Sequence, residues 1–270
     1  MPPYESGRRL CLLMEAGETR FSVEATSIME VAAPGPDETS LRGVLEVKDL
    51  SVLLGGEPEP GPGMVVVFDV SPTLAVRVRS IVEVVDVAQA PHFLLPPGLG
   101  DTLTALSHSA VLHKERLYLE LSAEALPHEP GAMSPPPEHR VALTEGLPER
   151  SLVFESQGRL FGLPLPLVSQ VVMKGSSFSA LPGKGGAVAG VLPHGQALWP
   201  VYSAPALLGA PALAEAFIVL IEVAGRGLGL CAARVLGVHP RFEPSEEPGE
   251  FRAPGLPTAV LFLDVQRMFS

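Results

Sequence analysis

Apolar residues recur along this chain in short runs, and glycine, proline or polar residues separate one run from the next. Residues 64–70 (MVVVFDV) and 217–223 (FIVLIEV) are typical of buried strands, whereas residues 117–121 (LYLEL) alternate with a period of two. No helical period extends beyond about three turns, and only residues 203–208 and 265–269 are expected to form single helical turns. The pattern predicts an all-β protein with many short strands and tight turns.

The strand pattern occurs twice. Residues 12–23 (LLMEAGETRFSV) and 152–163 (LVFESQGRLFGL) both read as strand, turn and strand at an offset of 140. Further matched segments follow in the same order: 28–31 with 168–171, 42–45 with 189–192, 64–70 with 217–223, 74–84 with 228–238, and 117–121 with 260–265. This order predicts two copies of one β module.

A proline-rich segment, residues 127–150, separates the copies and is expected to be a linker between domains at 1–126 and 151–270. The two domains differ in charge. Residues 1–126 hold 9 Lys/Arg and 18 Asp/Glu, whereas residues 151–270 hold 8 of each. An acidic first domain and a neutral second domain are expected to meet different partners.

The amino-acid composition argues against several classes of protein. With 46% hydrophobic and 18% charged residues the chain is not disordered, and a net charge of −11 argues against nucleic acid as a partner. Two cysteines, Cys11 and Cys231, lie in apolar runs and are expected to be buried cytosolic thiols. The N-terminus does not resemble a secretory signal, and four prolines interrupt the charge-free stretch 185–214, so membrane insertion is not expected. These features predict a cytoplasmic protein.

The order of the repeated pieces resembles the CheW-like domain, the module of chemotaxis coupling proteins that also occurs in the CheA kinase and in CheV. The shared pieces are a strand hairpin, an "I-x-E-V" step at residues 28–31, an "R-G-V" step at 42–44, an apolar strand, and an "L-x-V-x-V-x-x-I-x-E-V" run at 74–84. The resemblance covers about residues 8–126 and 150–270. It implies that each domain consists of two small five-stranded SH3-like barrels.

Both halves depart from the family pattern. The second half has Ala189 where the family has the arginine of "R-G-V", and Ser203 where it has an aspartate. The first half keeps Arg42 and Asp49 but lacks about seven residues between them relative to the family. One strand pair of its first barrel is therefore expected to be shortened or lost.

We find no catalytic constellation in the sequence. The seven histidines form no metal-binding spacing, the glutamates at 243–250 are expected to lie in a solvated loop, and residues 225–229 (GRGLG) join two strands as a turn. We therefore expect no catalytic residue, no metal and no cofactor.

Four residues are candidates for partner binding. The resemblance aligns Arg42 with a family arginine at the receptor-facing groove and Glu30 with the glutamate of "E-V". The alternatives are an arginine that closes a turn and a solvent-facing strand residue, while Val31 and Val44 are expected in the core. Trp199 and Leu198 alternate along one strand, so one of them must leave the core. An exposed tryptophan would suit an interface, and a buried hairpin is the alternative.

The resemblance implies a non-enzymatic adaptor that couples chemoreceptors to a CheA-type histidine kinase. A divergent scaffold for motility or cell-polarity proteins, without receptor binding, is the second hypothesis. A hydrolase or transferase on a β scaffold is the third, and the missing constellation argues against it.

Overall fold

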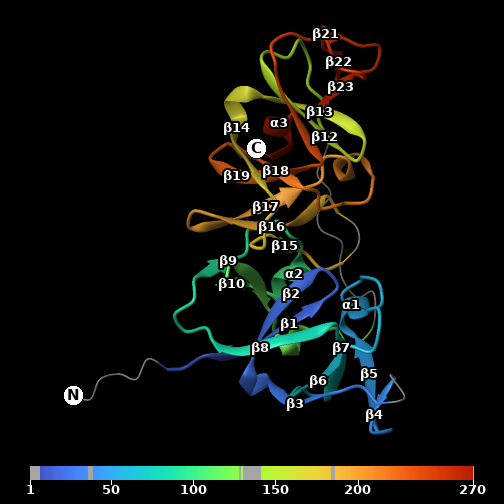
Figure 1. Cartoon of the computed structure of the whole chain (residues 1–270), viewed down its shortest axis with the longest axis vertical. Helices are drawn as coiled ribbons and strands as arrows, with labels where there is room; N and C mark the ends of the chain where they lie inside the picture. Colours follow the sequence, from blue (N-terminus) through green and yellow to red (C-terminus); the bar gives the residue numbers. More distant parts are fainter. Residues whose placement is uncertain (1–6, 36–38, 128, 130–140, 184–185, 270) are drawn as a thin grey trace, which may run out of the picture. The chain divides into compact units, whose positions relative to one another are not determined.

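The computed structural model describes residues 7–35, 39–127, 129, 141–183 and 186–269 (Figure 1). It confirms the predicted all-β class, since four sheets hold the described strands and the helices are single turns or little more. The chain divides into two compact units. The first contains residues 1–136, 176–184 and 193–198, and the second contains residues 137–175, 185–192 and 199–270.

Two sheets form the first half of the chain. In spatial order, the six-stranded sheet consists of β8 (Ser80–Asp86), β1 (Leu10–Ala16), β2 (Thr19–Glu24), β11 (Arg116–Glu120), β10 (Ser109–His113) and β9 (His92–Leu94). The five-stranded sheet consists of β3 (Ile28–Ala32), β6 (Met64–Phe68), β7 (Leu74–Val78), β5 (Leu45–Asp49) and β4 (Ser40–Leu41). Its helices are η1 (Ala25–Ser27), α1 (Leu50–Leu53), α2 (Asp101–Leu106) and η2 (Ala123–Ala125).

Two further sheets form the second half. The first consists of β20 (Arg234–His239), β12 (Ser151–Ser156), β13 (Arg159–Pro164), β23 (Val260–Phe262), β22 (Glu250–Arg252) and β21 (Glu243–Pro244). The other consists of β14 (Val168–Met173), β18 (Phe217–Val223), β19 (Arg226–Ala232), β17 (Ala197–Tyr202), β16 (Val188–His194) and β15 (Ser179–Ala180). Its helices are η3 (Leu165–Leu167), η4 (Ala206–Leu208) and α3 (Val265–Phe269).

The registers of the strands repeat between the halves. The β1–β8 ladder shifts between Leu13 and Met14, and the β12–β20 ladder shifts between Val153 and Phe154, 140 residues later. The ladders of β3 with β6 and of β14 with β18 shift at a second pair of positions with the same offset. Because a bulge is a specific local feature of a ladder, its recurrence at both places shows that the halves are copies of one fold.

Each copy buries a strand on both faces, which explains the continuous apolar runs in the sequence. In β12, Leu152 and Phe154 join a core with Ile221 of β18, whereas Val153 points to the other face. Val153 packs there in an aromatic cluster in which the ring of Phe262 meets that of Phe242 edge-on at 5.0 Å. One strand thus serves two cores, so it has no polar face.

The strand counts differ slightly from the expected five. Three sheets have six strands because each gains a short strand of two or three residues at one end, namely β9, β15 or β21. The hairpin of the first half is shortened but present: β4 and β5 have two and five residues, against seven and six for β16 and β17. β5 still pairs in parallel with β7, as β17 does with β19.

Part of the expected linker is attached to the second half. Leu143 forms an antiparallel bridge with Leu263, the Thr144 N–H donates to the Phe262 carbonyl, and the Asp264 N–H donates to the Ala142 carbonyl. A Cβ on Gly249 would lie 2.7 Å from the Leu143 side chain, so the glycine makes room for this contact. Residues 130–140 of the linker lie outside the described part of the chain.

None of the helices among the described residues has the length and apolar character needed to cross a membrane.

Candidate partner-binding surface

The turn between β4 and β5 brings two of the predicted residues together. Arg42 has a φ of 55° and Gly43 a φ of 68°, and the Val44 N–H donates to the Leu41 carbonyl at 3.2 Å. This tight turn directs the Arg42 guanidinium, which is 71% exposed, to the carboxylate of Glu30 on β3. The sequence suggested both residues as separate contacts and contained no sign that they form an ion pair.

The position of the ion pair indicates the curvature of the five-stranded sheet. β3 and β4 are its two end strands, and the Glu30–Arg42 pair connects one with the turn that follows the other. A cavity of about 530 Å³ lies at the same place, lined by Ala32, Ser40 and Leu41 among others. The sheet therefore curls so that its edges approach each other, as in a small barrel.

Exposed apolar side chains accompany this pair, and two of them were expected in the core. Val44 is 90% exposed and Val31 is 41% exposed, so the expectation for both is wrong. Val44 lies in the turn, and Val31 shares the outward face of the end strand β3 with Met29, which is 61% exposed. We call Met29, Glu30, Val31, Arg42 and Val44 the Arg42 surface. Apolar residues around a charged group are typical of protein interfaces.

The second pair of candidates lies on β17 in the second half. Leu198 is buried, so it has almost no surface to offer a partner, and Trp199 is half-buried. The indole ring rests on Gly227 of β19, where any Cβ would overlap it. Most large apolar side chains that follow in the charge-free stretch are also buried, including Val201, Tyr202 and Leu207. Partner binding by Leu198 and Trp199 stays a prediction.

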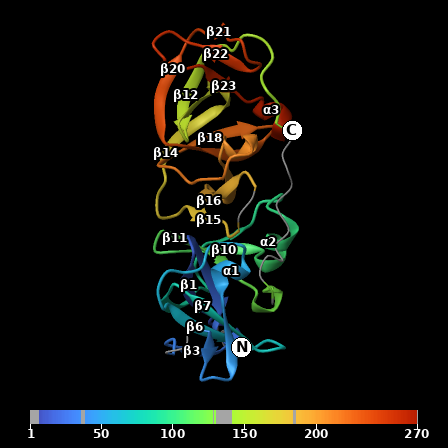
Figure 2. The same ribbon diagram turned by 90° about the vertical axis from the view of Figure 1, so that its right-hand side faces the viewer.

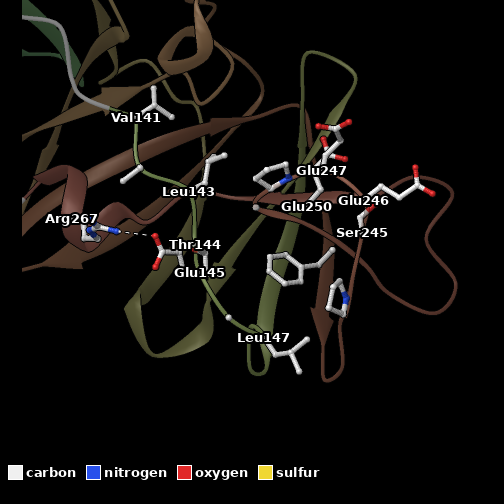
Figure 3. A pocket seen from close by; sticks show the side chains of 16 residues that line it. Val141, Leu143, Thr144, Glu145, Leu147, Ser245, Glu246, Glu247, Glu250 and Arg267 are labelled. Carbon is white, nitrogen blue, oxygen red and sulfur yellow. Dashed lines mark ion pairs between the residues drawn. The ribbon is translucent and has the colours of Figure 1, made fainter.

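A larger cavity, of about 740 Å³, lies between the segment around Leu143 and the β21–β22 hairpin (Figure 3). Glu246, Glu247 and Glu250 lie on the hairpin side, and Glu145 faces Arg267 across 3.7 Å on the other. The lining contains no histidine, cysteine or lysine. The cavity is therefore acidic on its hairpin side and holds an ion pair on the other.

A buried carboxylate joins the two sheets of the first half. Glu59, in the loop after α1, accepts hydrogen bonds from the Gly17 N–H and from the Ser51 hydroxyl at 2.7 Å, and it pairs with Arg79 at 3.0 Å. Gly17 lies in the β1–β2 turn of the other sheet. Glu59 therefore fixes the loop to that turn, and we call it the Glu59 latch.

The second half has the same latch with different neighbours. Glu215 accepts a hydrogen bond from the Gln157 N–H at 2.9 Å, and Gln157 stands 140 residues after Gly17. The Ser156 hydroxyl donates to the other carboxylate oxygen. The pairing registers align Cys231 with Arg77, which puts Ala233 where the first half has Arg79, the ion-pair partner of Glu59.

The two thiols are poorly suited to nucleophilic chemistry. Burial raises the pKa of Cys11 above its ordinary value, and burial raises the pKa of Cys231 to about 11. The thiolate is the reactive form, so both are almost fully protonated near neutral pH. Within the described residues, no group of three His, Cys, Asp or Glu side chains could hold a metal ion.

Comparison with known protein families finds a match in the second half of the chain. Residues 150–269 match the family model described as CheW-like domain. Among solved structures, the chain is similar to the crystal structure of the scaffolding protein TtCheW from Thermoanaerobacter tengcongensis, with 20% sequence identity and a TM-score of 0.38. That match covers 46% of this chain and 93% of the other. A comparison with curated proteins finds no match.

Proposed function

Since residues 150–269 match the CheW-like domain family model and the first half repeats their strand topology, we propose that this chain is a cytoplasmic, non-enzymatic adaptor with two CheW-like domains. In this role it couples chemoreceptors to a CheA-type histidine kinase. Two modules on one chain hold two partners at high effective concentration, so weak single contacts add up.

The observation that carries the proposal is the Arg42 surface. The exposed guanidinium of Arg42 pairs with Glu30 and stands two residues before Val44, which is 90% exposed, so the turn offers a partner both charge and apolar area. The exposed ion pair itself contributes little stability, about 0–1 kcal/mol. Its presence on an apolar face is therefore better explained by binding than by folding.

A second candidate function is a scaffold for motility or cell-polarity proteins that does not bind receptors. The feature that favours it is the loss of the arginine at position 189, which leaves the second half without a counterpart of Arg42. Under this candidate only the first domain keeps a family-like contact.

Binding assays with Arg42→Glu test the proposal. The purified chain is immobilised and exposed to a CheA-type kinase and to a chemoreceptor cytoplasmic fragment from the same organism. Charge reversal should weaken binding of at least one of them about tenfold or more. Arg226→Glu, an equally large change at an exposed site on β19, is the matched control and should bind normally.

The outcomes separate the hypotheses. If the unaltered chain binds neither the kinase nor the receptor, the coupling role is wrong. Capture of motility or polarity proteins in that case supports the second candidate. If the kinase or receptor binds and Arg42→Glu binds equally well, the coupling role stands and the Arg42 surface is not the contact. Turnover of a substrate without any partner would contradict the non-enzymatic assignment.

A further inference from the structure

The first sheet of each half ends in a strand that pairs on one side only within the described chain. These end strands are β8, which pairs with β1, and β20, which lies beside β12 (Figure 2). Both expose apolar side chains: Val82 and Val84 are 37% and 59% exposed, and Leu236 and Val238 are 36% and 40% exposed. Soluble proteins usually protect such edges, because an apolar end strand associates with other chains.

The two exposed rows occupy equivalent positions. Val84 lies opposite Leu12, and Val238 lies opposite Leu152, which is the counterpart of Leu12 in the second half. The duplication has therefore kept an outward apolar row on this strand twice. Packing of the core does not require it, since both rows face solvent.

β8 and β20 complement each other when they run antiparallel. One register aligns all outward residues in pairs: Val82 with Val238, Val84 with Leu236, and Asp86 with Arg234. The same register puts Glu83 opposite Gly237, which has no side chain to collide with it. Apolar pairs and opposite charges across antiparallel strands each stabilise the pairing.

The charged pair is available for this contact. Asp86 is exposed, and hydrogen bonds from the Ala88 and Arg9 N–H groups lower the pKa of its carboxyl, which keeps it ionised. The Arg234 side chain is 68% exposed while it pairs with Glu155. A guanidinium has five N–H donors, so it can meet a second carboxylate.

Pairing of like strands lacks this complementarity. An antiparallel pair of β8 strands centred on Val84 puts Asp86 opposite Val82, and a pair of β20 strands centred on Leu236 puts Arg234 opposite Val238. Each charge then lies against an apolar side chain with no opposite charge across the pair, which costs its solvation without a compensating contact. The charge pattern thus selects β20 as the partner of β8.

We propose that β8 of one copy packs antiparallel against β20 of a second copy, in the register that pairs Val84 with Leu236 and Asp86 with Arg234. The partner is a second copy because this chain itself carries the complementary row. Each copy has one strand of each kind, so the contact is heterologous. It either closes a dimer through two such contacts or continues into longer assemblies. The proposal does not depend on which signalling proteins the chain binds.

Disulfide trapping between singly substituted copies tests the contact and its register. Val84→Cys and Leu236→Cys proteins are mixed under mild oxidation, and the crosslinked product is weighed by mass spectrometry. Cys11 and Cys231 are 1% and 0% exposed, so they do not compete. The mixture should form the mixed disulfide about tenfold more than Val84→Cys mixed with Leu213→Cys, whose side chain is exposed outside any strand.

Sedimentation of the unmodified chain provides the second measurement. The mass should rise with concentration, and Val84→Glu should shift the association to about tenfold higher concentration, whereas Met173→Glu on β14 should not. The proposal is overturned if the chain stays monomeric at every concentration, or if the mixed disulfide forms no faster than the control. Preferential self-crosslinking of Val84→Cys also overturns it, because that result places β8 against β8.

Discussion

The indole of Trp199 lies on the backbone of Gly227, and this contact changes what the residue can do. Alternation along the strand predicted that one of Leu198 and Trp199 leaves the core, and in the structure Leu198 is buried whereas Trp199 is half-buried. Alternation carries no information on what covers that face, because the neighbouring strand β19 contributes the glycine. The tryptophan is therefore both a packing residue and a half-exposed surface.

The contact predicts coupled effects of substitutions at Trp199 and Gly227. Gly227→Ala should destabilise the protein by about 1–3 kcal/mol, because the added Cβ collides with the ring. Trp199→Ala removes the ring and should cost about as much, but in that background Gly227→Ala should cost much less. Urea unfolding of the two single variants and the double variant measures the coupling.

Additive costs at the two positions would show that the ring does not rest on the glycine. Partner binding is measured on Trp199→Ala at a temperature where it is fully folded. Weakened binding by that folded variant is expected if the exposed part of the ring also contacts a partner. Met173→Ala, at an exposed site, is the control and should stay within about 0.5 kcal/mol of the unaltered chain.

At the scale of elements, each half has a loop held by one carboxylate, buried for Glu59 and half-buried for Glu215. Glu59 and Glu215 join corresponding loops to corresponding turns, although their neighbours differ. Glu59 has a charged partner, Arg79, at 3.0 Å, whereas Glu215 is held by a hydroxyl and a backbone N–H among the contacts described above. A carboxylate thus holds the loop in both halves, with an arginine beside it in the first half and with uncharged donors in the second.

This difference predicts unequal costs for the same substitution. Glu59→Gln should lower the free energy of unfolding by about 2–3 kcal/mol, since a buried charge-assisted contact with Arg79 is lost. Glu215→Gln should cost less, about 1 kcal/mol, because the amide oxygen still accepts one of the two hydrogen bonds and no contact with an arginine is lost. Thermal unfolding measures both, with the exposed Glu46→Gln as control. Equal costs would show that Arg79 does not stabilise the buried carboxylate.

The elements also show what a sequence pattern can predict. Core strands such as β6 and β18 are recognisable from their own continuous apolar runs. Their order along the chain is recognisable because it occurs twice. Sequence patterns do not reveal short elements, because few residues contribute to the hydrophobic period. α2 buries Leu103 and Leu106 on one face, but six residues are too few to establish a helical period.

The sequence suggested Glu30 and Arg42 as separate candidates and did not predict the surface that surrounds them. Glu30 and Arg42 lie 12 positions apart, and they meet only because the five-stranded sheet curls and the turn gives Arg42 a positive φ. Val44 was expected in the core because it is apolar. Its place in that turn depends on the shortened hairpin, whose geometry cannot be derived from hydrophobicity.

At the scale of the whole molecule, the chain has two halves that share a strand topology and differ in charge. The first half carries a charge of −9 and the second is neutral, yet their cores have the same strand topology. Selection on the fold keeps apolar strands, whereas the surface can diverge. Different charge on a common fold is expected where two modules meet different partners.

Two compact units should also open separately, and each contains one buried thiol that reports on it. Phe68→Leu in the first half should speed alkylation of Cys11 about tenfold, as about 1.4 kcal/mol of local stability is lost, while the rate at Cys231 stays unchanged. Phe262→Leu should do the reverse. Because burial raises the pKa of both thiols, modification requires opening of the surrounding core. Mass spectrometry after a timed pulse of iodoacetamide measures each site. Equal acceleration at both cysteines by either variant would show that the halves unfold as one cooperative unit.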